Sequence, residues 1–430
     1  LGRHFSHLEI LTLLGTALLA LRWLRRRIRH RASRTTHHAS HIAHHASRIT
    51  HHASRITHHA SRITNLDWPV LAFATVSALS LLTARNTGVA QREFRVVIVE
   101  AALFYLLVNR VRRDDGRPLS LWPLVDGLVL GALAVSLIGL WQLVTGQGRV
   151  DVEGVWRVRA FYGSPNNLGL YLDRIVPLLA ALLAYGATRW RRRAYGLLLI
   201  PIGLACVATF SKGALLLGLP AAVLFLGVAG SLLPRSSAPL HLRSPAQEGR
   251  RWRPLVIALA LLLLAALAMM PLFRTARFAG LFDFRQGTSF IRLQLWRGAL
   301  NMALDHPLLG VGLDNFLYAY RTRYVLPVAW EELNLSHPHN IVLDFWTRLG
   351  LLGLAVGVWL MAAGFRAGWT TWRRTDSADR RALLLGLLAS LVATLAHGLI
   401  DNSIFLVDLA FVFMLTLGVF QRGRRPGDKG

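Results

Sequence analysis

The chain has 430 residues, of which 53% are hydrophobic and only 17% are charged, whereas soluble domains carry about 25% charged residues. Apolar runs of about 20 residues recur along it, and each could cross a hydrocarbon core about 30 Å thick. This composition excludes a soluble enzyme. The single cysteine, Cys206, excludes a disulfide framework and any multi-cysteine metal site. The net charge is +27, and only two of the 49 basic residues are lysines, Lys212 and Lys429.

In chain order, the apolar runs predict an all-α fold, a polytopic membrane helix bundle of about eleven spans. Charged residues inside these spans, such as Asp126, Asp173 and Arg174, should face the bundle interior or a cavity. The expected spans are residues 8–24, 68–84, 95–111, 121–145, 167–187, 194–210, 213–233, 254–273, 349–369, 382–400 and 403–420.

Arginine clusters follow every second expected span, which by the positive-inside rule places those loops in the cytoplasm. Residues 146–166, 211–212, 274–348 and 398–402 should then lie on the outer side. A further span before Leu1 would give twelve spans with both chain ends in the cytoplasm. Membrane topology and attraction to anionic head groups account for most of the positive charge, so we expect no nucleic-acid partner. The basic clusters are Arg25–Arg27, Arg110–Arg113, Arg189–Arg193, Arg250–Arg253, Arg373–Arg374 and Arg422–Arg425.

Residues 31–65 form a low-complexity His/Arg repeat with a period of seven, built on HASRITH. One interpretation is a short coiled coil or a His-rich metal tract. The favoured one is a duplicated, mostly disordered cytoplasmic arm, because its Ala/Ile seam is thin and no acidic residue or cysteine accompanies the histidines. The domains expected from this pass are 1–30 (first span and basic flank), 31–65 (repeat), 66–420 (membrane domain with an outer loop at 274–348) and 421–430 (basic cytoplasmic tail).

The long outer loop carries polar and aromatic residues at high density. Residues 289–304 have helical periodicity, and Asp305-His306-Pro307 and Gly310-Val311-Gly312 are expected to end that helix. Arg292 lies off the apolar face. The residues that share that face are Phe290, Leu293, Trp296, Leu300 and Leu304.

Two residues at membrane boundaries could take part in chemistry. His339, followed by Asn340, comes just before an apolar helix, and histidine suits proton transfer near neutral pH. The alternative is an interfacial residue that caps the helix. Lys212 occupies a short break between two spans, Phe210-Ser211-Lys212-Gly213. It is either an interfacial anchor or a phosphate-binding ammonium.

Two further polar segments are expected near the outer ends of spans. Gly163-Ser164-Pro165-Asn166-Asn167 is either a turn with a helix cap or the polar rim of a cavity. His397 to Asn402 includes Asp401, which could be either solvated or part of a site.

Together these motifs resemble the superfamily of O-antigen ligases and O-antigen polymerases, which are integral membrane glycosyltransferases. His339-Asn340, nine residues, then Gly350-Leu351-Leu352-Gly353 is similar to that family's H-[N/S/Q]-x9-G-x-x-G signature. The stretch from Arg292 to Phe316, the turn Phe210 to Ala214, Gly163 to Asn167 and Asp401-Asn402 match in kind and order. The similarity covers about residues 66–420 and leaves out the repeat.

The resemblance implies transfer of a glycan from an undecaprenyl-diphosphate carrier to an acceptor on the outer face of the bacterial cytoplasmic membrane, without a metal or other cofactor. His339 would be the base, and Arg292 and Lys212 would hold phosphates. Lys212 departs from the arginine that is usual in ligases, so bidentate binding is not expected there. The partners would be the lipid-linked donor, a glycan, lipid or protein acceptor, and membrane lipids. The expected substrate-binding residues are Asn340, Asn166, Asn167, Asp401 and Arg297.

Two other classes of function remain open. A transporter or flippase of a lipid-linked saccharide would also show charges inside spans, but no inverted repeat or paired broken spans are evident. A sensor or scaffold would be favoured by loss of the catalytic residues, and these are present apart from the Arg-to-Lys change. The motifs are shared by ligases and polymerases, which differ in the acceptor.

Overall fold

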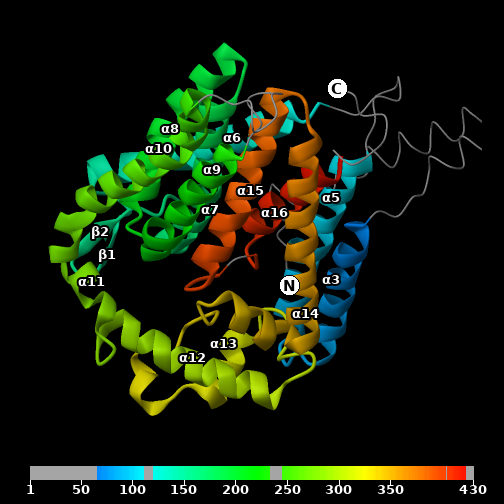
Figure 1. Cartoon of the computed structure of the whole chain (residues 1–430). Coiled ribbons are helices and arrows are strands. Elements are labelled where there is room, and N and C mark those ends of the chain that lie inside the picture. Colours follow the sequence, from blue (N-terminus) through cyan, green and yellow to red (C-terminus); the bar gives the residue numbers. More distant parts are fainter. Residues whose placement is uncertain (1–64, 111–119, 233–244, 403, 423–430) are drawn as a thin grey trace, which may run out of the picture.

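The computed structural model describes residues 65–110, 120–232, 245–402 and 404–422, and the regular secondary structure within them is helical apart from one short hairpin (Figure 1). Among these residues, six helical segments are long and apolar enough to cross a membrane, so the protein is a polytopic membrane protein. These segments are α6 (Trp122–Thr145), α7 (Pro165–Tyr185), η3 with α9 (Ala214–Gly218 and Leu219–Ser231), Trp252–Met269 of α10 (Pro245–Met269), α14 (Ile341–Arg374) and α15 (Ala378–Gly398).

Four other helical segments coincide with expected spans but are shorter or carry more charge. Ten of the eleven expected spans therefore fall on helices. The remaining one, 8–24, and the repeat up to residue 64 lie outside the described residues. The total number of spans and their orientation stay predictions. The four segments are α3 with η1 (Asp67–Leu79 and Ser80–Leu82), η2 with α5 (Phe94–Val99 and Glu100–Arg110), α8 (Arg189–Ala208) and α16 (Val407–Arg422).

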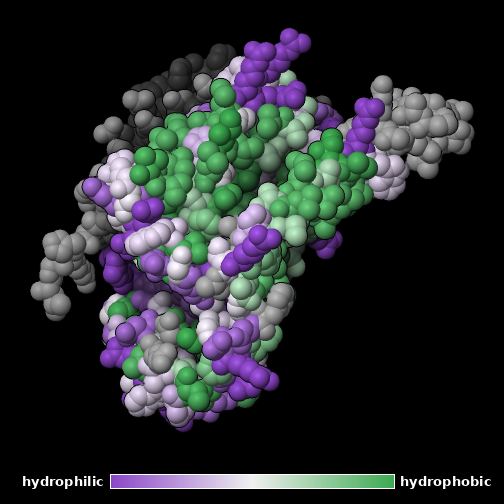
Figure 2. All heavy atoms as spheres, turned by 90° about the vertical axis from the view of Figure 1, so that its left-hand side faces the viewer, coloured by the Kyte–Doolittle hydropathy of each residue, from purple (hydrophilic) through white to green (hydrophobic). Residues whose placement is uncertain are grey.

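Helices α7 and α15 form the centre of the bundle, where they pack against each other. Of their membrane-length windows, 72% and 78% are buried, whereas only 6% of the α10 window is. A helix that exposes apolar side chains on nearly every side is suited to contact with lipid rather than water. Figure 2 shows the corresponding broad hydrophobic surface above a mainly polar region.

The hairpin consists of β1 (Val150–Val152) and β2 (Val155–Arg157), paired antiparallel with Val152 opposite Val155. Glu153 and Gly154 form its two-residue turn, both with positive φ, the conformation that suits tight hairpins. The all-α prediction omitted this element. Its position matters because the turn extends the Glu153 carboxylate toward Arg277 and Lys212.

The segment between α10 and α14 forms a separate layer beneath the bundle in Figure 1. Its main element, α12 (Gly287–Asp305), confirms the expected helix and its expected end. The apolar face indicated by periodicity is not the buried one, however, since Leu300 and Leu304 are exposed. The small residues Gly298 and Ala299 are buried instead, and Gly298 allows the chain at Tyr324 to approach α12 closely. The rest of the layer comprises η5 (Met270–Arg274), α11 (Ala276–Ala279), η6 (Gly280–Phe282), α13 (Phe316–Ala319), η7 (Tyr320–Tyr324) and η8 (Pro327–Glu332); α4 (Thr87–Glu93) contacts it from the bundle side.

Helix α14 begins before the expected span and is kinked at Gly350, which has φ 70° and ψ −171°. The chain after α12 crosses at this kink. Its Pro307 carbonyl accepts a hydrogen bond from Leu351 N (2.7 Å), and Val311 N donates to the Thr347 carbonyl (2.8 Å). A Cβ at position 350 would lie 2.0 Å from the Leu308 oxygen. Glycine is therefore required at the first glycine of the His-Asn-x9-Gly-x-x-Gly motif, where it fixes the start of α14 against the end of α12.

Candidate functional site

A cavity of about 150 Å³ lies between the hairpin, the start of α7, the break after α8, α12 and the segment before α14. Four residues expected to be functional, His339, Arg292, Lys212 and Asn166, line it together. They come from four separate parts of the chain. The other lining residues are Val152, Arg157, Arg277, Thr288, Ile291, Leu295 and Leu335.

Four cations line this cavity, and the Glu153 carboxylate lies close to two of them. Glu153 Oε2 lies 2.9 Å from Arg277 Nη1 and 3.6 Å from Lys212 Nζ. Arg157 donates to the Asn166 side-chain oxygen and to the Thr209 carbonyl, both at 2.6 Å. Arginine and lysine in excess over carboxylate, inside a partly closed cavity, favour an anionic ligand.

Burial and the proximity of other cations lower the pKa values of two of these residues. Burial lowers the pKa of Lys212 to about 8, and Arg277 acts in the same direction while Glu153 opposes it. Burial, with a further contribution from Arg277, lowers the pKa of Arg157 to about 9. A bound anion would oppose this repulsion and raise both pKa values again.

The turn that carries Lys212 is held by contacts on both sides. Phe210 adopts a positive φ of 45°, and its carbonyl accepts a hydrogen bond from Arg277 (3.1 Å). Gly213 packs against the His397 ring, where a Cβ would lie 2.1 Å from the nearest ring carbon. The Ser-Lys-Gly sequence therefore directs Lys212 into the cavity while the glycine leaves room for a buried histidine.

Arg292 and Trp296 lie one turn apart on the same side of α12, so the prediction that Arg292 lies off the face of Trp296 is wrong. Arg292 lines the cavity, and Trp296 Nε1 donates to the Pro338 carbonyl at 2.9 Å. Because Pro338 directly precedes His339, this hydrogen bond fixes the histidine segment to the helix that carries Arg292. The four-residue spacing between Arg292 and Trp296 thus sets the position of Arg292 relative to His339.

The His339 imidazole is oriented by a buried carboxylate. Its Nδ1 lies 2.8 Å from Asp401 Oδ1, so Nδ1 donates and Nε2 keeps a lone pair. Its backbone has a positive φ of 49°, and the Asn340 side chain caps α14 by accepting from Val342 N and Leu343 N. Burial lowers the pKa of His339, helped by His337 and opposed by Asp401. The imidazole is therefore neutral at pH 7, the state a general base requires.

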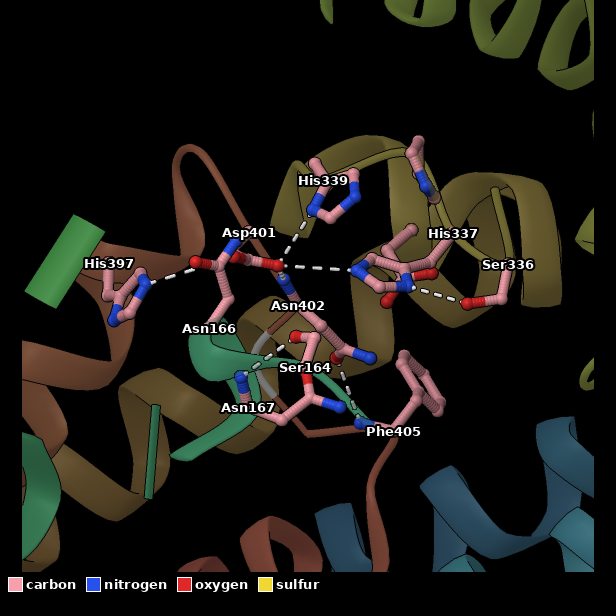
Figure 3. Close-up of polar contacts among 12 residues, drawn as sticks. Ser164, Asn166, Asn167, Ser336, His337, His339, His397, Asp401, Asn402 and Phe405 are labelled. Atoms are coloured by element: carbon pink, nitrogen blue, oxygen red, sulfur yellow. Dashed lines mark hydrogen bonds and ion pairs between the residues drawn. The ribbon is translucent and has the colours of Figure 1, made fainter. Parts of the chain in front are cut away.

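Asp401 is the centre of a larger polar network (Figure 3). His337 Nε2 lies 3.2 Å from the same carboxylate oxygen, and its Nδ1 is 3.1 Å from Ser336 Oγ. Behind it, His397 Nε2 lies 4.0 Å from Asp401 Oδ2, while His397 Nδ1 lies 2.5 Å from Asp173. Burial raises the pKa of the Asp401 carboxyl, but His339 and His337 outweigh it and hold that pKa well below its usual range.

The other expected binding residues lie beside the cavity rather than on its wall. Asn340 donates to the Leu399 carbonyl (3.0 Å) besides capping α14. The backbone N–H of Asn167 bonds to Ser164 Oγ, which caps α7. Arg297 is exposed and bonds to Gln294 on its own helix. Asp401 acts through the two histidines.

The structure also adds residues that the sequence did not single out for a role. Arg157 and Arg277 line the cavity, Glu153 balances part of their charge, and His337 shares Asp401 with His339. A single sequence carries little signal for the two arginines, because arginine is abundant throughout the chain. His337 lies two residues before His339 and could have been included on that ground.

His337, His339 and Asp401 could also hold a metal ion, since their potential ligand atoms all lie within 4.8 Å of one another. Two imidazoles and a carboxylate suit zinc. Both imidazoles are hydrogen-bonded to one carboxylate oxygen in this structure. A metal ion would therefore have to displace the N–H protons of these two hydrogen bonds. Independence of metal stays a prediction.

The fold and this cavity define a polytopic helical membrane protein that combines a cation-lined cavity with an oriented histidine. The model of the O-antigen ligase family matches residues 196–358, which include Lys212, Arg292 and His339. An O-antigen ligase from Salmonella typhimurium is 29% identical over 134 residues, an alignment that spans 30% of this chain and 30% of that relative. Residues 196–358 are therefore similar to the O-antigen ligase family, which confirms the resemblance drawn from the motifs.

Proposed function

We propose that this protein transfers a glycan from an undecaprenyl-diphosphate carrier to an acceptor on the outer face of the bacterial cytoplasmic membrane, as an O-antigen ligase or a polysaccharide polymerase. The observation that carries the proposal is the meeting of four cations and an Asp401-oriented histidine in one cavity. The family match over residues 196–358 supports it.

In the proposed reaction, the acceptor hydroxyl gives its proton to His339 Nε2 as its oxygen attacks the anomeric carbon of the donor sugar. The bond from that carbon to the diphosphate oxygen breaks, and the carrier diphosphate leaves with the electron pair. Arg292, Lys212, Arg157 and Arg277 stabilise the negative charge that develops on the leaving group. Asp401 stabilises the imidazolium formed at His339.

The charged residues within the spans do not favour a transporter or flippase. Asp126 accepts from the Tyr195 hydroxyl (2.5 Å), and Arg174 donates to the Leu409 carbonyl (3.2 Å). Asp173 is bonded to His397. Each of these contacts joins two helices of the bundle, which is a structural use of a polar group in a membrane.

The proposal is tested by His339→Ala and Arg292→Gln in proteoliposomes supplied with lipid-linked donor and acceptor. We expect His339→Ala to lower the transfer rate by about 10² to 10⁴-fold and Arg292→Gln to lose most activity. Arg285→Gln, which changes an exposed arginine of the same layer, is the matched control. Near-normal transfer by His339→Ala would exclude the proposed role.

A chelator separates the two interpretations of the His337–His339–Asp401 group. We expect activity to survive dialysis against EDTA, because the proposed reaction uses protein cations alone. Loss of activity that zinc restores would assign a metal to the site.

A further inference from the structure

A second cavity, of about 350 Å³, opens at the far end of α12. The first cavity contacts Arg292 near the start of the helix, and the second contacts His306 just after its end. At 1.5 Å per residue the fourteen-residue interval corresponds to about 21 Å. Residues of the layer that contains α12 and α13 (Figure 1) line both cavities. The second cavity is lined by Thr83, Arg85, His306, Val311, Asn315, Tyr318, Ala319, Thr322, Arg323 and Tyr324.

The walls of this second cavity are held in place independently of any ligand. Asn86 N donates to Asn315 Oδ1 (2.8 Å), and Asn315 Nδ2 donates back to the Asn86 carbonyl (3.2 Å). This reciprocal pair joins segments 229 residues apart. Elsewhere in the lining, Tyr324 donates its hydroxyl to Asp305 (2.8 Å), and Arg323 pairs with the same carboxylate (3.1 Å). A cavity fixed by such contacts loses little entropy when a ligand binds.

The lining chemistry suits an acidic saccharide. Thr83 and Thr322 offer hydroxyl groups for a polyhydroxylated ligand. The Tyr318 side chain, 42% exposed, presents an aromatic face with a polar tip. Arg85 is exposed and has no hydrogen-bond or ion-pair partner among the residues that the structure describes. Arg85 therefore supplies the charge for a carboxylate or phosphate substituent, whereas Arg323 is already paired with Asp305.

We propose that this second cavity binds acidic sugar units distant from the reacting one, so that a glycan lies along α12 between the two cavities. The identity of the ligand rests on the proposed glycan transfer. The sugars belong either to the donor glycan or to the acceptor glycan, and the experiment distinguishes these sources. The function of the cavity is to hold a long glycan in register while its end reacts.

The kinetic test uses Tyr318→Ala and Arg85→Gln, which change exposed side chains. Trp330→Ala is the control, since Trp330 is an exposed aromatic residue of the same layer outside the cavity lining. Donor is extracted from the source organism and used with its own acceptor. We expect a rise of about tenfold or more in one KM, with kcat within about twofold of the wild type. A higher donor KM assigns the cavity to the donor glycan, and a higher acceptor KM assigns it to the acceptor glycan.

Unchanged KM values in both variants would overturn the inference, as would a lower kcat with both KM values unaltered. A donor trimmed to one sugar provides a further check if the donor KM rises, because Tyr318→Ala should then have no effect on it. Equal loss with the trimmed donor would show that the cavity does not bind distant sugars.

A binding measurement separates failure of this inference from failure of the proposed function. Glycans released by mild acid from the same donor and acceptor preparations are added to solubilised His339→Ala protein, and saturation-transfer NMR records contact with glycan protons. Signals that disappear when Tyr318→Ala is added to the His339→Ala protein would support glycan binding in the second cavity, even if the wild type transferred no glycan. Signals that Tyr318→Ala leaves unchanged, or their absence with both glycans, would overturn it.

Discussion

Replacing Asp401 with asparagine tests the central electrostatic element of the site. The buried Asp401 carboxylate accepts from His339 Nδ1 (2.8 Å), His337 Nε2 (3.2 Å) and Asn402 N (2.8 Å). Asparagine has nearly the same shape but no charge, and its amide nitrogen can force His339 into the tautomer that carries the proton on Nε2. That tautomer cannot accept a proton from the acceptor.

The expected loss follows from these contacts. Without the charge, the imidazolium formed in the transition state lacks its stabilising partner, and part of the neutral population has the wrong tautomer. Together these effects should lower kcat by about 10² to 10⁴-fold, as for loss of a general base, with a smaller change in donor KM. Each tenfold corresponds to about 1.4 kcal/mol of transition-state stabilisation.

The assay is transfer by purified protein in proteoliposomes, with initial rates at saturating donor. Asp376→Asn, which changes an exposed carboxylate between α14 and α15, controls for the substitution itself, and a thermal melt in detergent controls for folding. A folded Asp401→Asn variant that keeps more than about a tenth of the wild-type kcat would refute the assignment of Asp401 as the orienting group.

Three further predictions concern pH, stability and topology. The value of kcat/KM should fall at pH values below the lowered pKa of His339, where the base is protonated, and above about pH 8, where Lys212 loses its proton. Lys212→Arg should keep much of the activity and shift only the alkaline limb of the profile to higher pH. An unshifted limb would exclude Lys212 as its source. Gly350→Ala should lower thermal stability by more than about 2 kcal/mol, because of positive φ and a clash with the Leu308 carbonyl, whereas Gly203→Ala, with open space around it, should not; equal melting temperatures would contradict the account of the kink. In a Cys206→Ser background, Arg321→Cys should react with an impermeant maleimide in intact cells, because residues 274–348 are expected outside; reaction only after lysis would reverse the topology.

The helices of this protein are determined largely by local sequence. Apolar runs of membrane length form helices because lipid cannot satisfy free backbone groups, and ten of the expected spans fall on helices in the structure. The end of α12 at Asp305 follows from local signals in the same way. Local sequence also predicted four of the cavity residues, because unusual residues at span boundaries stand out and match family motifs. These are Lys212, Arg292, His339 and Asn166.

Only the tertiary structure decided how these residues act. The buried face of α12 could not be predicted from periodicity, because Gly298 and Ala299 are buried there by the close approach of the chain at Tyr324 and not by large apolar side chains of their own. The partnership of His339 with Asp401 joins residues 62 positions apart. The contributions of Arg157 and Arg277 depend on a hairpin turn and a short helix that meet at Glu153. Such electrostatic groupings arise from the packing of distant segments, and no single segment contains the information.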